Sequence, residues 1–185
     1  MLITDDQRRL VTGNRAACAM LGIARDEVSW LTMDRFTPAS ERRRLEEQWA
    51  TFLAAGAAAG SYTLEVANQE PVRVEFGATA NVLPSRHLMV FVAPGEASNE
   101  PRDLGEPWAP VALDLRGRRE LTKREREIMT LVATGSQSGE IANRLYLSTE
   151  TVKSHVQNAM GKLGSHTRAH AVATALVTGQ ITWDP

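Results

Sequence analysis

The sequence predicts a mixed α+β domain with an antiparallel sheet, followed by an all-α domain of four helices. Three patterns support this fold class. Apolar and polar residues alternate over residues 61–92, which is typical of strands joined by short turns. Apolar residues recur at helical spacing over residues 121–176, and four closely spaced prolines interrupt regular structure between the two patterns. The expected units are residues 1–94, a linker of residues 95–118, and residues 119–185.

In the first unit, two helices precede most of the strands. Asn14 is a suitable N-cap for a helix that ends at Gly22, and a second helix is expected between Pro38 and Gly56. The segment "GAAAG" at 56–60 is expected to be the end of that helix and a turn. The expected strands are residues 2–4, 9–12, 61–66, 72–82 and 87–92.

The alternation in residues 72–82 is unbroken, which predicts that all their apolar side chains share one face of the sheet. These side chains are Val72, Val74, Phe76, Ala78, Ala80 and Val82.

The segment "ITDDQRRLVTGNRAACAMLG", followed by "ARDEVSWLTMDRFTP", resembles the start of a PAS sensory domain. That family begins with a strand, an Asp-containing turn, a second strand, and a helix that starts at Asn and ends in Leu-Gly. The matching residues are Asp5, Asp6, Asn14, Leu21 and Gly22. The resemblance covers about residues 1–94. It implies a sheet with flanking helices that senses a signal or supplies a dimer contact.

PAS domains hold haem, flavin, a small metabolite or no ligand, and here neither haem nor flavin is expected. Residues 38–55 contain no His that could bind iron, and no Cys lies in an "NCRFLQ"-like flavin motif. His87 is expected on the surface beside a hairpin turn, because it has no partner ligands nearby in the sequence; no metal is predicted. Five aromatic residues either line a small-molecule pocket or simply form the core. They are Trp49, Phe52, Tyr62, Phe76 and Phe91.

The composition is that of an ordinary globular protein, with 43% apolar and 23% charged residues among 185. No apolar run approaches the roughly 20 residues of a membrane span, and the start "MLITDDQRRL" lacks the order of a signal peptide. Cys18 is the only cysteine, which excludes an intramolecular disulfide and favours a buried, unreactive thiol. A cytoplasmic protein with no membrane partner is expected.

The net charge of -1 conceals an asymmetry between the two halves. Residues 1–115 hold 11 Arg against 16 Asp plus Glu, whereas residues 116–185 hold 10 Lys plus Arg against 6 Asp plus Glu. The C-terminal half is therefore the basic one, which is a modest indication of an anionic partner for that half.

Four helices are expected after the linker, each with a recognisable start. Thr122 and Glu125 form a capping box for the first helix, and Ser148 and Thr167 cap the third and fourth. Gly164 is placed to end the third helix. The second helix is short, and a tight turn joins it to the third. Two such helices, the second with an outward polar face, form a helix-turn-helix.

The third helix, in "TVKSHVQNAMGKLG", has an apolar side and a polar side. At 100° per residue the apolar stripe comprises Val152, Val156, Ala159, Met160 and Leu163. The polar side carries Gln and Asn, which can pair with adenine, Lys, which can pair with guanine, and hydroxyl residues, which can bind bases or phosphates. On its own this pattern also fits an ordinary helix whose polar side is merely solvated.

The surrounding segments "LTKREREIMTLVATG", "EIANRLYLSTETVKSHVQNAMGKLG" and "SHTRAHAVATAL" closely resemble a LuxR-type (GerE-like) DNA-binding domain over about residues 119–181. The resemblance implies that the third helix is the recognition helix, with Lys153, Ser154 and Gln157 facing base edges. The remaining candidates would contact phosphates or the groove edge; they are Ser148, Thr149, Thr151, His155 and Asn158. The fourth helix corresponds to the family's dimer surface, which implies a homodimer.

The sequence departs from the family pattern at the start of the second helix. Ser136 stands at a usually apolar place, Gln137 where a capping Ser is common, and Ser138-Gly139 where Asn-Lys is usual. These departures predict a weaker start for that helix and the loss of one phosphate contact.

The function expected from the whole chain is that of a sequence-specific transcriptional regulator that binds promoter DNA and works with RNA polymerase. One alternative is a two-component response regulator, although about 95 residues are few for a receiver domain and the strand pattern differs from alternating strands and helices. A second alternative is a sigma-factor-like promoter-binding protein, which would need a helical polymerase-binding domain upstream. No sequence motif of an enzyme is present, so no catalytic activity is expected.

Overall fold

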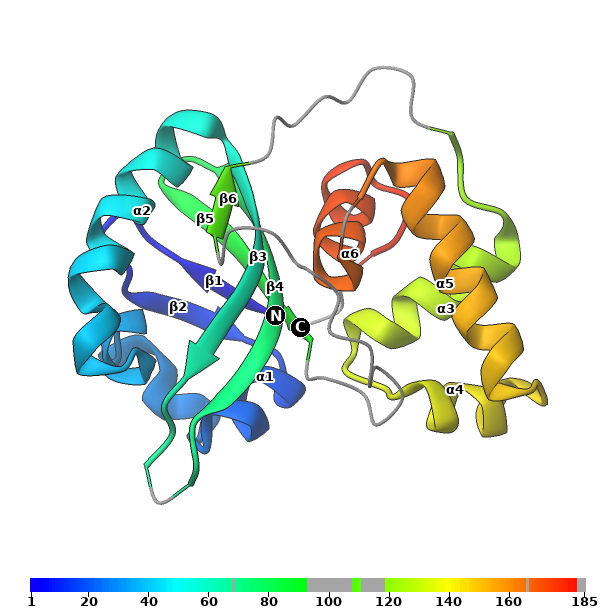
Figure 1. Cartoon of the computed structure of the whole chain (residues 1–185), viewed down its shortest axis with the longest axis horizontal. Coiled ribbons are helices and arrows are strands. Elements are labelled where there is room, and N and C mark those ends of the chain that lie inside the picture. Colours follow the sequence, from blue (N-terminus) through cyan, green and yellow to red (C-terminus); the bar gives the residue numbers. More distant parts are fainter. Residues whose placement is uncertain (68, 93–107, 111–118, 166, 183–185) are drawn as a thin grey trace.

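The computed structural model describes residues 1–67, 69–92, 108–110, 119–165 and 167–182, and the chain forms two halves (Figure 1). The first half is a sheet with helices, and the second is a group of four helices. The predicted linker lies outside the described residues except for Trp108–Pro110. In the described ranges, no helix is both long and apolar enough to cross a membrane.

Six strands form one sheet in the order β2-β1-β5-β4-β3-β6, and every pair of neighbours is antiparallel. The strands are β1 (Leu2–Thr4), β2 (Leu10–Gly13), β3 (Ala57–Leu64), β4 (Val72–Leu83), β5 (Arg86–Val92) and β6 (Trp108–Pro110). The predicted antiparallel sheet with flanking helices is confirmed. A receiver domain would need a parallel sheet with helical crossovers, so the response-regulator alternative does not fit this half.

Two features of the β3 edge differ from the sequence prediction. Residues Ala57–Gly60 belong to β3, whereas a helix end and a turn were expected there. In addition, β6 lies within the predicted linker and pairs with Ala58, Ala59 and Gly60 of β3. Alanine and glycine have low strand propensity, so pairing on both sides, and not local preference, makes this segment a strand. Pro110 is compatible with β6 because β6 is an edge strand.

Helices cover one face of the sheet. They are α1 (Arg15–Leu21), α2 (Arg42–Ala55) and three 3-10 turns, η1 (Arg25–Trp30), η2 (Met33–Phe36) and η3 (Ala39–Glu41). The Asn14 side chain accepts a hydrogen bond from the Ala17 amide at 2.9 Å, and Gly22 ends α1 in the left-handed conformation, as predicted. The five aromatic residues singled out in the sequence are buried in the core between α2 and the sheet.

Strand β4 does not keep all its apolar residues on one face, so the prediction for residues 72–82 was wrong at the C-terminal end; the other end keeps its register but lies at the edge of the core. Val72 is 38% exposed. Asn81 has a positive φ of 54°, and the register with β5 shifts between Thr79 and Leu83. This irregularity reverses the side-chain alternation. Val82 therefore packs on the opposite side of the sheet, with the C-terminal helices.

His87 is fully buried, which corrects the expectation of a surface histidine. It lies on the inner face of β5, with its ring 5.7 Å from that of Trp49 and 5.8 Å from that of Phe52. Its Nδ1 accepts a hydrogen bond from the Asn81 amide at 3.1 Å, so its Nε2 carries the proton and donates to Asp6 Oδ1 at 3.1 Å. Burial lowers the pKa of His87 below its ordinary value, and Asp6 offsets only part of this effect.

This arrangement predicts acid sensitivity of the first half. His87 is neutral in the folded chain but titrates near 6.5 when unfolded, so the unfolded state binds more protons below that pH. Stability should therefore fall as pH decreases from about 7 through 6.5 toward the lower folded pKa. Urea unfolding at several pH values between 7.5 and 5.5 measures the slope. His87→Phe should give a flatter dependence from a lower starting stability, and parallel curves for the two proteins would contradict this assignment.

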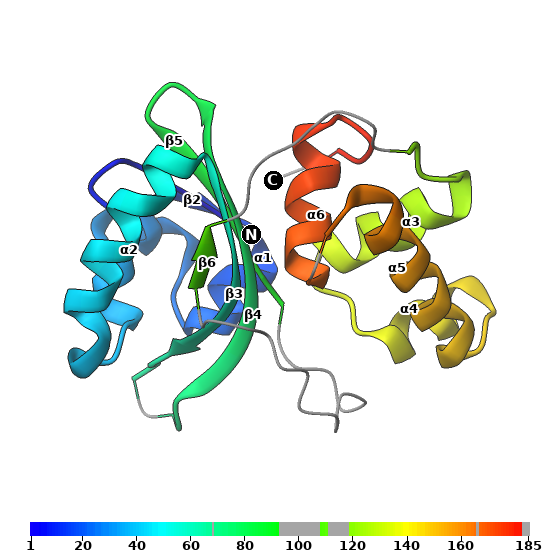
Figure 2. The same cartoon turned by 45° about the horizontal axis from the view of Figure 1, so that its top comes forward.

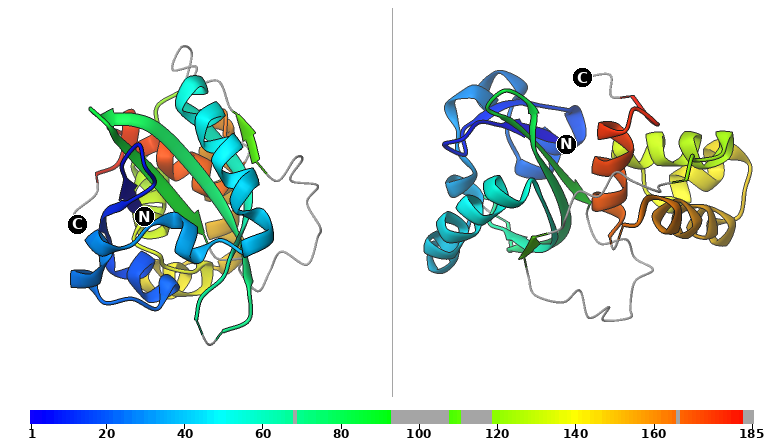
Figure 3. Two further views of the ribbon diagram at one scale, coloured as in Figure 1. Left: turned by 90° about the vertical axis from the view of Figure 1, so that its left-hand side faces the viewer. Right: turned by 90° about the horizontal axis from the view of Figure 1, so that it is seen from above.

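The C-terminal half contains the four predicted helices. They are α3 (Lys123–Ala133), α4 (Ser138–Leu145), α5 (Thr149–Leu163) and α6 (Arg168–Val177). Helix α6 lies between α3 and α5 on one side and strands β4 and β5 on the other (Figures 2 and 3). The face of the sheet not covered by α1 and α2 is thus covered by α6.

Candidate nucleic-acid interface

Helices α4 and α5 form a helix-turn-helix. Tyr146 ends α4 in the left-handed conformation, and the Leu147 amide donates to the Ala142 carbonyl at 2.9 Å, which closes the turn. The Ser148 hydroxyl then accepts from the Thr151 amide at 3.0 Å and caps α5 as predicted. Gly164 ends α5 with a φ of 60°.

The apolar side of α5 fixes its orientation. All five residues of the predicted stripe are buried against α3, α4 and α6, each with no more than 5% of its surface exposed. The side chains from the other helices that meet this stripe include Ile128, Met129, Ile141 and Val172. Because this side is fully used in packing, the opposite side of α5 must face outward.

One ion pair connects the end of α5 to the start of α3. Lys162 Nζ lies 2.7 Å from Glu125 Oε2, and the same carboxylate accepts from the Thr122 amide at 2.7 Å. Burial acts to raise the pKa of Glu125, but the hydrogen bonds from Lys162 and Thr122 outweigh it, and the net pKa lies below the ordinary value. The carboxylate therefore remains charged at neutral pH and holds the two helices in register.

The outward side of α5 carries the predicted contact residues. Ser148, Thr149, Ser154, Gln157 and Asn158 are exposed, and the other three are partly exposed. Those three are Thr151, Lys153 and His155. The structure thus places all eight at or near the accessible side of one helix, over about three helical turns, and an α-helix fits a major groove.

Four of these side chains have intramolecular partners that DNA would have to replace or share. The hydroxyl oxygens of Ser148 and Thr151 lie 2.8 Å apart. Lys153 Nζ lies 3.4 Å from Glu150 Oε2, an exposed pair that is weak. Ser154 donates to the Glu150 carbonyl at 3.0 Å, which leaves its oxygen free to accept a hydrogen bond from a base. Gln157 and Asn158 are exposed and well suited to bidentate contacts.

Comparison with known proteins gives the family of this C-terminal half. The family described as "Bacterial regulatory proteins, luxR family" matches residues 119–175. The spore germination protein GerE of Bacillus subtilis is 44% identical over 61 residues, which are 33% of this chain and 82% of GerE. The chain belongs to the luxR family. The probable transcriptional regulatory protein NarL of Mycobacterium tuberculosis is 41% identical over 82 residues, or 44% of this chain, but the chain spans only 34% of NarL.

Solved structures similar to this luxR-family protein cover either part of the chain or nearly all of it. The structure of the transcription factor GerE is 36% identical, covers 36% of this chain and 100% of its own, and has a TM-score of 0.35. A domain of a sensory box sensor histidine kinase/response regulator from Geobacter sulfurreducens is 21% identical, covers 49% of this chain and 78% of its own, and has a TM-score of 0.43. A VqmA dimer of Vibrio cholerae, described as a LuxR-type receptor, is 17% identical, covers 96% of this chain and 82% of its own, and has a TM-score of 0.40.

The start of α4 shows the consequence of the departures from the luxR-family pattern. The Gln137 side chain makes no capping hydrogen bond, and Glu140 Oε2 accepts from the Gln137 amide at 2.8 Å. The first turn of α4 therefore has only one of the two reciprocal hydrogen bonds of a capping box, which agrees with the weak helix start that the sequence predicted.

One candidate contact of this luxR-family domain was not predicted from the sequence. Tyr146 is 96% exposed and has a φ of 55°, an uncommon conformation for a residue with a large side chain. It lies in the turn that directly precedes α5, and Arg124 supports that turn by donating to the Leu145 carbonyl at 3.0 Å. A strained, exposed aromatic residue beside a binding surface is a reason to test it for function. The sequence contained a signal, since Tyr stands where glycine is usual after a helix.

Proposed function

We propose that the protein is a sequence-specific transcriptional regulator that binds promoter DNA through the outward side of α5. The observation that supports this most directly is the row of exposed polar side chains on a helix whose other side is fully buried. Lys153, Ser154 and Gln157 would contact base edges, and Ser148, with the N-terminus of α5, would bind a phosphate. The other contact candidates would position the helix in the groove.

The rest of the function is proposed as follows. The PAS-like half senses a signal, and two chains pair to bind two half-sites, as helix-turn-helix proteins commonly do. RNA polymerase is the expected further partner, and a regulator that binds promoter DNA acts where the chromosome is, in the cytoplasm. We propose that the PAS-like half holds neither haem nor flavin. We also propose that the protein has no catalytic activity. A Soret or flavin absorption band in the purified protein would contradict the cofactor part.

Selection of bound sequences from random DNA, followed by footprinting of the selected site, tests the proposal. A specific complex in the nanomolar range is expected, with an affinity that falls steeply as salt rises because phosphate contacts release counterions. Equal affinity for selected and unselected DNA would contradict sequence-specific binding. The footprint also gives the half-site spacing and therefore the number of bound chains.

Tyr146 gives a separate prediction. Tyr146→Gly should stabilise the domain by up to about 1 kcal/mol, because glycine adopts a positive φ without strain. The same change should weaken DNA binding by about 0.5–1.5 kcal/mol, the usual contribution of one hydrogen bond, and equally for all sequences. Thermal unfolding and binding titrations measure the two effects. Tyr146→Phe is the matched control for the hydroxyl, and undiminished DNA binding by the glycine variant would remove Tyr146 from the interface.

A further inference from the structure

A cleft lies at the junction of the two halves, beside the start of α6. Helix α1 and the end of β5 line it from the PAS-like half, and the end of α3, the start of α4 and Arg168 line it from the C-terminal half. Its volume is about 130 Å³. An apolar cavity of roughly 150 Å³ can hold one benzene ring. The cleft can therefore take a molecule of about the size of one ring or of a short branched chain.

One part of the wall is apolar and comes from both hydrophobic clusters of the protein. Met20 and Phe91 belong to the core between α2 and the sheet or pack against it, and Val92 and Val132 do the same in the cluster around the C-terminal helices. An apolar group in the cleft would thus contact both clusters and leave water. Removal of apolar surface from water is the main source of affinity in most small-molecule sites.

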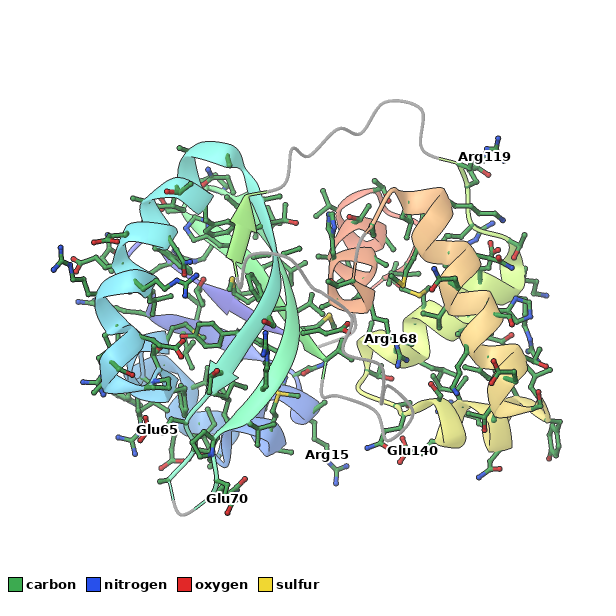
Figure 4. The ribbon with its side chains drawn as sticks, viewed as in Figure 1. Arg15, Glu65, Glu70, Arg119, Glu140 and Arg168 are labelled. Atoms are coloured by element: carbon green, nitrogen blue, oxygen red, sulfur yellow. The ribbon has the colours of Figure 1, made fainter. Side chains whose placement is uncertain are left out.

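The other part of the wall is polar and contains a cation. Arg168, the first residue of α6, lies between the two halves (Figure 4) and lines the cleft. Ser136 and Ser138, which precede and begin α4, line it as well, and both are partly exposed. A guanidinium group has five N–H donors, so Arg168 can donate two parallel hydrogen bonds to a carboxylate in addition to its contacts within the protein. The serine hydroxyls can donate to the same carboxylate.

The charges beside the polar wall favour an anion with a single charge. Glu75 Oε2 accepts from the Arg168 amide at 3.3 Å, and Glu140 Oε2 accepts from the Gln137 amide at 2.8 Å. These two carboxylates would repel a second negative charge on the ligand. A phosphate ion also has no apolar part to place against the apolar wall. A monocarboxylate with an apolar body matches both parts of the wall.

Close backbone approaches on both sides of the junction hold the walls in place. A Cβ atom at Gly77 of β4 would lie 2.5 Å from the Cα and N atoms of His170 in α6. A Cβ atom at Gly135, which has a φ of 96°, would lie 2.5 Å from the Cβ atom of Ala16 in α1. The two halves therefore touch closely around the cleft. A ligand that enters a site formed in advance loses little affinity to the ordering of the protein.

The polar wall also contains the residues at which the sequence departs from the luxR-family pattern. Ser136 stands at a usually apolar place, and Ser138 precedes Gly139 where Asn-Lys is usual. A leucine at position 136 would add carbon atoms to this wall and remove a hydroxyl group. The same departures that weaken the start of α4 thus leave the cleft open and give it polar groups.

We propose that this cleft binds a small monocarboxylate whose body is one aromatic ring or a short branched chain. Arg168 holds the carboxylate, and Met20 and Phe91 contact the apolar body. The site is separate from the aromatic core of the PAS-like half and from the outward side of α5. Binding requires no DNA, so the failure of this proposal and the failure of the proposed function are distinguishable.

Benzoate, phenylacetate and isovalerate are the probes that test the proposal. Isothermal titration calorimetry measures their affinity, and shifts of amide signals in two-dimensional NMR spectra locate the site. Benzamide is a control with the size of benzoate and no charge, and phosphate is a control with charge and no apolar body.

Two variants test the walls, and circular dichroism confirms their folding. Arg168→Met removes the cation, and Ser136→Leu fills part of the cleft. Arg43→Met and Ser40→Leu are the matched controls, because both positions are exposed and neither lines the cleft.

At least one probe should bind saturably at one site per chain, with a dissociation constant on the order of 0.1–1 mM, as expected for a ligand of about ten non-hydrogen atoms. The amides of α1, of residues 135–138 and of Arg168 should shift most. Benzamide and phosphate should bind at least tenfold more weakly than that probe. Arg168→Met and Ser136→Leu should each weaken its binding at least tenfold, and the two control variants should match the wild type.

Three results would overturn the proposal. They are shifts centred on Tyr62 and Phe76, which would place the ligand in the core of the PAS-like half, equal affinity for benzoate and benzamide, and no saturable binding of any probe at tenfold higher concentration. If a cleft variant does not fold, the shifts and the comparison with benzamide in the wild-type protein still decide the question.

Discussion

Replacement of Lys153 and Gln157 together by alanine should abolish the preference of the protein for its own site. Each side chain is accessible on α5, and each well-made base contact contributes about 1–3 kcal/mol of discrimination. If the two contributions add, the double variant loses about 2–6 kcal/mol of specific binding, while binding to unrelated DNA weakens much less. Competition titrations with selected and scrambled DNA at one fixed salt concentration measure the difference.

Thr149→Ala is a useful control for this experiment, because Thr149 is exposed at the N-terminus of the same helix but is proposed to contact the backbone only. It should weaken specific and nonspecific binding alike, with no change in preferred sequence. The unfolding midpoint of the double variant should remain close to that of the wild type, since neither side chain is buried. An unchanged footprint and sequence preference would exclude the two residues from base recognition.

Leu163→Ala should produce the largest loss of stability among the changes on α5. Leu163 has no exposed surface and packs in the C-terminal core near the end of the helix. Truncation of a buried leucine to alanine costs about 2–5 kcal/mol, from lost burial and the cavity left behind. The loss is comparable to the whole stability of many small domains, so DNA binding should disappear together with the fold.

Chemical denaturation followed by circular dichroism measures this effect, and Gln157→Ala is the matched control on the same helix. Gln157 is exposed, so its replacement should change the unfolding free energy by no more than about 0.5 kcal/mol while it weakens DNA binding. Comparison of the two variants therefore separates the effect of core packing on stability from the effect of an exposed contact residue on DNA binding. Equal losses of stability in both would contradict the assignment of a buried and a free side of α5.

Signals contained within a few residues predicted the helices of the C-terminal half and their ends well. The capping box predicted at Thr122 is present, with the Glu125 amide 3.2 Å from the Thr122 hydroxyl, and Ser148 and Gly164 delimit α5 as expected. These predictions succeeded because caps and helical periodicity are local properties of the chain. The same periodicity separated the buried and accessible sides of α5.

Features that depend on distant contacts were not predicted. His87 is buried because β5 lies beside the aromatic residues of α2, and no residue near it in the sequence indicates this. Residues Ala57–Gly60 form a strand only because β4 and β6 pair with them. The covering of the sheet by α6 joins residues more than 90 positions apart, such as Glu75 and Arg168. Tertiary contacts override local preference at each of these places.

The absence of space between β4 and α6 also constrains how this protein can evolve. A side chain at position 77 would collide with main-chain atoms of Ala169 and His170, which no substitution at positions 169 or 170 can remove. A point mutation at Gly77 therefore has no simple compensating change. Descendants that retain this packing of α6 on β4 should retain glycine here, and a lineage with any other residue at this position should hold its two halves differently.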